Sequence, residues 1–203
     1  MARLKNGILG GFSGKVGTVV GYTRFGQTYM RSTPKKITKE PSEDQLINRK
    51  AMKAAMAWLK PIVAYVRIGF QNYSEKQHGF GSAVSYIKLN ALRKDKTVDS
   101  SLALISWGDL PLPEDAAVSN SKPGILEFTW QVDKESKDRA LVLVYANATE
   151  HMGDLCGARR KEGMHILECQ QLIGKEADIY LGFVSEERDR CSNSVYLGRM
   201  RIE

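Results

Sequence analysis

The 203-residue chain has few cysteines and no long apolar run. Its three cysteines, Cys156, Cys169 and Cys191, are an odd number without CxxC spacing, which argues against a disulfide framework. No apolar stretch approaches the roughly 20 residues that a membrane-spanning helix needs, and glycines interrupt the apolar residues near the N-terminus. We therefore expect neither a membrane span nor a signal peptide, and a location in the cytoplasm or in a particle assembled there.

Motifs for catalysis and cofactor binding are also missing. Gly14-Lys15 resembles the end of a phosphate-binding loop, but Leu9 stands where that loop needs a glycine and Val16 where it needs Ser or Thr. His165 and Cys169 are four residues apart in an expected strand, a separation of about 13 Å that is too long for one zinc ion. The sequence therefore predicts a protein that is not an enzyme and that has no cofactor, no metal and no small-molecule substrate.

The net charge of +7 is unevenly distributed along the chain. Residues 1–96 hold 18 Lys and Arg against 5 Asp and Glu, whereas residues 97–203 hold 12 against 18. A basic half favours nucleic acid or an acidic protein surface as a partner. It equally allows the basic half of one copy to bind the acidic half of the next.

The first forty residues are rich in glycine and predict a β-hairpin over residues 15–33. Val, Thr and Tyr fill both arms, and the segment Arg24-Phe25-Gly26-Gln27 supplies the turn. An isolated hairpin is marginally stable in water, so it should dock onto something. Basic and aromatic side chains alternate in the hairpin and the connector that follows, and we predict that they bind the partner: Lys15, Tyr22, Arg24, Phe25, Tyr29, Arg31, Lys35 and Lys36.

Helices are expected after this arm. Residues 42–45, Ser-Glu-Asp-Gln, form a capping-box pattern that predicts a helix start, and Pro61 should interrupt the helix. A second helical piece is expected over about residues 82–92, with Val84, Ile87 and Leu92 on one side. In the first helix, the apolar residues at helical spacing predict a core-facing stripe that includes both methionines: Leu46, Met52, Met56, Leu59 and Val63.

From about residue 100 the apolar residues alternate with a period of two. The runs that predict strands are 102–107, 125–131, 140–146, 164–169, 179–184 and 194–202. We therefore expect an α+β N-terminal module of hairpin and helices over residues 1–98, followed over residues 99–203 by an antiparallel sandwich of immunoglobulin or fibronectin type. Trp130 is expected in the core of that sandwich.

Several motifs, taken in order, resemble one family. They are GGFSGKVGTVVG at residues 10–21, RIGF at 67–70, AVSY at 83–86, SWGDLP at 106–111 and SNSVYLG at 192–198. The chain resembles a domain-of-unknown-function family that is widespread in Bacteroidetes genomes, and the resemblance covers nearly the whole chain. It departs at residues 39–44, which are less basic than the family's pattern. The resemblance implies no activity, cofactor or catalytic residue.

These observations predict a non-catalytic structural or interaction protein that self-associates or docks onto a protein partner through its basic N-terminal half. A phage- or prophage-like virion or assembly component is one such role, because those proteins often join an extended arm to a small sandwich. The alternative is a nucleic-acid-binding protein that uses the basic hairpin and connector. No membrane partner is expected.

Overall fold

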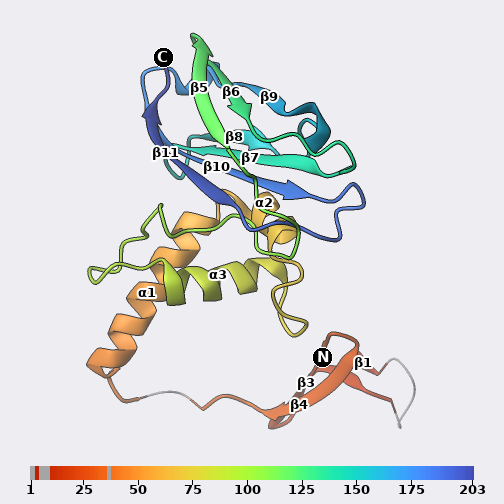
Figure 1. Ribbon diagram of the computed structural model, residues 1–203. Coiled ribbons are helices and arrows are strands. Elements are labelled where there is room, and N and C mark those ends of the chain that lie inside the picture. Colours follow the sequence, from red (N-terminus) through yellow and green to blue (C-terminus); the bar gives the residue numbers. More distant parts are fainter. Residues whose placement is uncertain (1–2, 5–9, 36–37) are drawn as a thin grey trace. The chain divides into compact units, whose positions relative to one another are not determined.

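The computed structural model describes residues 3–4, 10–35 and 38–203, and the chain forms two compact units, residues 1–43 and 44–203 (Figure 1). The first unit is an antiparallel sheet with the strand order β1-β2-β3-β4. Its strands are β1 (Arg3–Leu4), β2 (Phe12–Val16), β3 (Val19–Arg24) and β4 (Gln27–Ser32). The predicted hairpin is therefore confirmed as β3 and β4, with two further strands beside it.

The turn of this hairpin has the predicted position and an unusual residue in it. Arg24 pairs with Gln27, so Phe25 and Gly26 are the two turn residues, with φ values of +49° and +75°. Two positive φ values are typical of the type I′ turn, whose twist matches that of the flanking strands. Glycine adopts this conformation at no steric cost, whereas a phenylalanine there is uncommon.

The second unit begins with helices α1 (Glu43–Leu59), α2 (Val63–Gly69) and α3 (Gly79–Asn90). Pro61 separates α1 from α2, as predicted. Of the apolar stripe predicted for α1, Leu59 is buried as expected, but Leu46, Met52 and Met56 are not, because the helix buries Ala51 and Ala55 together with Leu59. These three residues are four apart and so share one side, and the small alanines let the helix approach its neighbours closely. The large apolar residues on the other side stay exposed: Leu46, Met52 and Met56.

Seven strands follow in two antiparallel sheets, which confirms the expected sandwich of immunoglobulin or fibronectin type. One sheet has the order β11-β10-β7-β8 and the other β5-β6-β9. Two short 3-10 turns, Arg160–Glu162 and Gln170–Leu172, lie in the connections. The strands are β5 (Ala117–Lys122), β6 (Ile125–Thr129), β7 (Arg139–Tyr145), β8 (His151–Asp154), β9 (Met164–Glu168), β10 (Glu176–Val184) and β11 (Val195–Arg201).

The strand predictions fail at three places. Residues 102–107 form an irregular segment, although Ala103 and Ile105 are fully buried. Neither β5 nor β8 was among the predicted strands. Both missed strands lie at sheet edges and carry polar residues, so the period-two apolar signal is weak in them.

The second unit has two hydrophobic cores in three layers (Figure 1). Between the two sheets, β7 and β10 contribute Val142, Ile179 and Phe183, and Trp130 lies in this core at 5% exposure, as predicted. On their other side, the same two strands pack against the helices. The boundary expected at residue 98/99 is thus a change from helices to strands inside one compact unit, because helices and sheet share a core.

Candidate interaction surface

The register of the N-terminal sheet decides which side chains share a face. Tyr22 lies opposite Tyr29, Val20 opposite Arg31, and Lys15 opposite Val20. Opposed residues of an antiparallel pair point to the same face, and every second residue of a strand does so too. One face of the sheet therefore carries five of the predicted partner-binding residues, and we call it the basic face: Lys15, Tyr22, Arg24, Tyr29 and Arg31.

The rings and guanidinium groups of this basic face contact each other. The rings of Tyr22 and Tyr29 stack with their centroids 5.6 Å apart and their planes 23° from parallel. The guanidinium carbon of Arg31 lies 5.7 Å from the centroid of the Tyr22 ring, within the range of a cation–π contact. The two tyrosines are 39% and 45% exposed, so the stack is open to a partner.

The other predicted residues lie elsewhere. Phe25 is in the hairpin turn, where the guanidinium carbon of Arg24 lies 5.3 Å from its ring centroid. Lys35 follows the sheet and is exposed, and Lys36 lies outside the described residues. The structure thus brings five of the eight predicted residues together on one face.

The opposite face of the same sheet is apolar, and the sequence analysis did not predict it. Phe12 and Val16 of β2 share this face with Val19 and Met30, and we call these four residues the apolar face. A side chain at Gly21 would overlap the Phe12 ring, so the glycine allows that ring to lie flat across the sheet. Val16 and Met30 are 56% and 70% exposed, which leaves this face uncovered within the described part of the chain.

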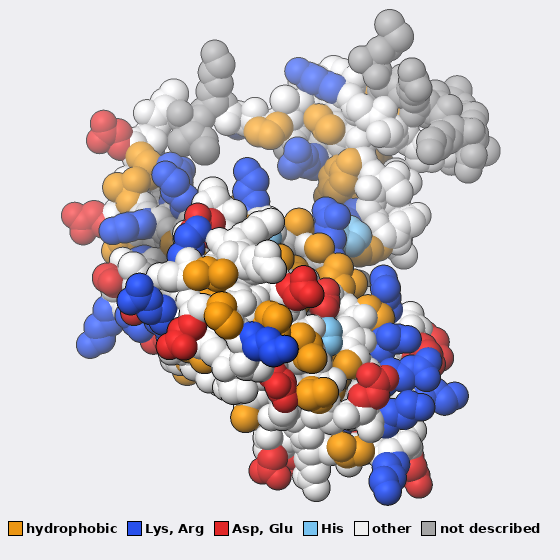
Figure 2. Space-filling view, turned by 90° about the horizontal axis from the view of Figure 1, so that it is seen from above, with side chains coloured by type: hydrophobic (Ala, Val, Ile, Leu, Met, Phe, Trp, Pro, Cys, Tyr) orange, Lys and Arg blue, Asp and Glu red, His pale blue; other side chains and the backbone are white. Residues whose placement is uncertain are grey.

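A third surface lies on the sandwich, on the outer side of the sheet β5-β6-β9. Leu126, Phe128 and Leu167 point into the core, so the alternate residues of β6 and β9 point outward. Figure 2 views the molecule from above this sheet and shows hydrophobic side chains beside acidic ones. We call this surface the acidic face and define it by its apolar and acidic members: Ile125, Glu127, Met164, Ile166 and Glu168.

The exposed methionines of α1 belong to a further surface feature. Met52 and Met56 line an apolar hollow of about 470 Å³ together with Phe80 of α3. Arg49 and Lys53 of α1 and Lys60, which follows it, also line the hollow. The two methionines, expected in a core, are 45% and 44% exposed.

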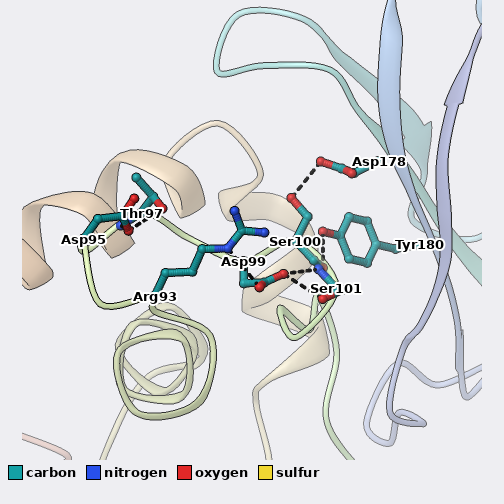
Figure 3. Close-up of polar contacts among 8 residues, drawn as sticks. All are labelled: Arg93, Asp95, Thr97, Asp99, Ser100, Ser101, Asp178 and Tyr180. Atoms are coloured by element: carbon teal, nitrogen blue, oxygen red, sulfur yellow. Dashed lines mark hydrogen bonds and ion pairs between the residues drawn. The ribbon is translucent and has the colours of Figure 1, made fainter.

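A polar cluster on β10 and β11 is centred on a buried carboxylate whose oxygens are all paired. Asp178 is 3% exposed, and its carboxylate accepts hydrogen bonds from Arg199 at 2.8 and 3.0 Å, Tyr196 at 2.8 Å and Ser100 at 2.7 Å. Burial alone would raise the pKa of Asp178, but these donors outweigh it and hold the pKa below its ordinary value. The hydroxyl of Tyr180 donates a hydrogen bond to the carbonyl of Ser100, so Ser100 is hydrogen-bonded to strand β10 (Figure 3).

His165 and Cys169, the side chains considered for zinc, do not share a site: His165 is hydrogen-bonded to other residues and Cys169 is buried. His165 Nε2 lies 2.8 Å from Asp154 Oδ2, and His165 Nδ1 accepts from the amide of Ala158. Burial raises the pKa of the Cys169 thiol to about 11, which disfavours the thiolate that binds metals. Among the described residues, no three His, Cys, Asp or Glu side chains are placed to hold a metal ion. Nor does any helix in those ranges have the length and apolarity to cross a membrane.

Comparison with known proteins places the chain in a family. Residues 11–198 match a family of unknown function, DUF6266. The chain belongs to this family. No curated protein matches this DUF6266 member.

One solved structure shows a weak similarity to the DUF6266 chain. The solution structure of the fn3 domain of human collagen alpha-1(XX) chain is 14% identical, over 45% of this chain and 83% of that domain. The TM-score is 0.34, which is too low to support an inference about function.

Proposed function

We propose that this protein is a non-catalytic interaction protein that docks onto a macromolecular partner through its N-terminal sheet. The observation that carries the proposal is that both faces of this sheet are exposed. All six residues of β4 are exposed, and among the described strand residues of the sheet only Gly21 is buried. A partner that covers this sheet would supply the second packed layer that a single exposed sheet lacks.

The two faces offer a partner different interactions. Covering a fully exposed valine or methionine stabilises a complex by about 1.5 to 3 kcal/mol, so Val16 and Met30 would each contribute roughly half of that or more. The cations of the basic face would add orientation and faster association. One face therefore favours affinity and the other favours selectivity.

As the biological setting, we propose a phage- or prophage-like assembly particle. The support is an analogy, since an exposed arm joined to a sandwich suits a subunit that binds its neighbours. We expect relatives of this chain to be widespread in Bacteroidetes genomes. Capsid or tail genes beside the genes for these relatives would support this setting, and isolated chromosomal copies would count against it.

The proposal is tested by photo-crosslinking in cells that naturally produce the protein. Benzoylphenylalanine replaces Tyr29 on the basic face or Met30 on the apolar face, and Lys134, exposed on the sandwich, serves as the matched control. We expect adducts with a macromolecule at residue 29 or 30 that are absent at residue 134. If neither face of the sheet gives an adduct above the control, the N-terminal sheet is not a docking surface.

Nucleic acid is the second candidate, and the stacked pair Tyr22 and Tyr29 beside Arg31 favours it. Aromatic rings with a nearby guanidinium are the type of platform on which unpaired bases stack. If single-stranded nucleic acid binds there, replacing Arg24 and Arg31 together by glutamine should flatten the slope of log affinity against log salt by up to about 2. The matched control replaces Lys53 of α1 and Lys60, which follows that helix, by glutamine. Failure to bind DNA or RNA at low salt would eliminate this candidate.

A further inference from the structure

We propose that the partner of the N-terminal sheet is a second copy of this chain, whose acidic face receives the basic face of the first. This inference rests on the proposed docking function and names its partner. Two different surfaces of one protein would meet in such a contact. The assembly is therefore head-to-tail, and it continues into a ring or a filament.

The two faces match in shape and in chemistry. Each is the exposed side of a small antiparallel sheet, and sheets pack face to face when apolar side chains fill the space between them. The stacked tyrosines of the basic face offer apolar area to Met164 and Ile166, which are 44% and 52% exposed. Among the outward residues of the acidic face, the register places Glu127 opposite Ile166 and Glu168 opposite Ile125, so carboxylates and apolar groups alternate across the strands.

The charges on the two faces are opposite. Of the ion pairs formed by the described residues, none includes Glu127 or Glu168, and none includes Lys15 or Arg31. Lys122, opposite Ile125 at the end of β5, is a base at the margin of the acidic face. Because exposed charge pairs add little affinity, the charges would orient the contact while the apolar side chains hold it.

The two halves of the whole chain also carry opposite net charges. The basic face belongs to the half that holds 18 Lys and Arg against 5 Asp and Glu, and the acidic face to the half that holds 12 against 18. Long-range attraction between unlike halves of two copies would raise the rate of encounter, and salt would reduce it. Like faces of two copies would repel each other, which disfavours a symmetric dimer through either face.

The experiment uses two full-length variants, each with one face reversed in charge. Variant A carries Arg24→Glu and Arg31→Glu, and variant B carries Glu127→Lys and Glu168→Lys. Sedimentation velocity at low salt should show wild-type protein as species that grow with concentration, and each variant alone as a monomer. An equimolar mixture of A and B should assemble again, because the intact basic face of B is complementary to the intact acidic face of A and the two reversed faces are also opposite in charge.

Control measurements separate assembly from folding. Circular dichroism melts check that A and B are folded. The variant Lys53→Glu with Lys60→Glu makes the same charge change as variant A in α1 and directly after it, and should assemble like the wild type. A monomeric wild type at every concentration, or a mixture of A and B that stays monomeric, would overturn the self-partner inference. Crosslinks from residue 29 to a different molecule would then still support the docking function, whereas the absence of adducts would overturn both.

Discussion

Replacing Trp130 by alanine should destabilise the second unit strongly, because three interactions meet at this side chain. It is 5% exposed in the core between the sheets, and its ring meets that of Phe183 edge-on at 5.4 Å. Its Nε1 group donates a hydrogen bond of 2.8 Å to the carbonyl of Arg160. The guanidinium carbon of Arg160 in turn lies 4.5 Å from the centroid of the Phe183 ring. Removing the indole therefore leaves a cavity, an unpaired carbonyl and a loosened cation–π contact.

The expected loss is about 3 to 5 kcal/mol, the range for deletion of a large buried aromatic side chain. Trp130→Phe keeps a ring in the core but leaves the carbonyl without its donor, which should cost about 1 to 3 kcal/mol. For a unit of this size, each kcal/mol lowers Tm by roughly 2 to 4 °C, so the alanine variant should melt roughly 6 to 20 °C lower.

Urea unfolding followed by far-ultraviolet circular dichroism measures both losses. Trp107→Ala is the matched control, since it removes the same side chain from a position that is 36% exposed and should cost less than Trp130→Ala. A loss below about 1 kcal/mol for Trp130→Ala would refute the placement of this residue in the core.

Two further predictions concern the helices and the polar cluster. Leu59→Ala, at a fully buried position of α1, should lower the free energy of unfolding by about 2 to 5 kcal/mol. Met56→Ala, at a 44% exposed position of the same helix, should lower it by less than about 1 kcal/mol. Equal losses in urea unfolding would show that the buried side of α1 is misplaced. Asp178→Asn should cost about 1 to 3 kcal/mol at pH 7. Because the folded-state pKa of Asp178 is lowered, its stabilisation is present above the unfolded-state value of about 3.9 and is lost as the pH falls through the folded-state pKa. Thermal melts should therefore show the two proteins converging at acid pH, and a constant difference from pH 7 to pH 3 would contradict the ionised network.

The sequence predicted the parts of the fold that local patterns specify. The hairpin follows from β-branched and aromatic residues on both sides of a turn with glycine, and the sandwich follows from runs with a period of two. The buried side of α1 could not be predicted in this way. Its alanines carry little hydrophobic signal, and their burial depends on the close approach of elements distant in the sequence.

Local sequence patterns likewise predicted only part of the interaction surfaces. The five residues of the basic face were predicted, because alternation within β3 and β4 and a short turn bring four of them together, and Lys15 lies on the strand directly before β3. The acidic face was missed, since Glu127 and Ile166 become neighbours only when β6 pairs with β9. No local pattern connects two residues so far apart in the sequence.

Strands β7 and β10 are buried on both faces, by the other sheet on one side and by the helices on the other, and this limits how the protein can be shortened. A fragment that starts at residue 99 would keep every strand of the sandwich but would lose the helices that cover Leu141, Leu143 and Tyr180. Those side chains would then form an apolar patch on an open sheet, a surface that promotes aggregation. For recombinant work, the shortest soluble fragment should therefore start close to residue 44, and a library of truncations would be expected to lose yield abruptly once α1 is removed.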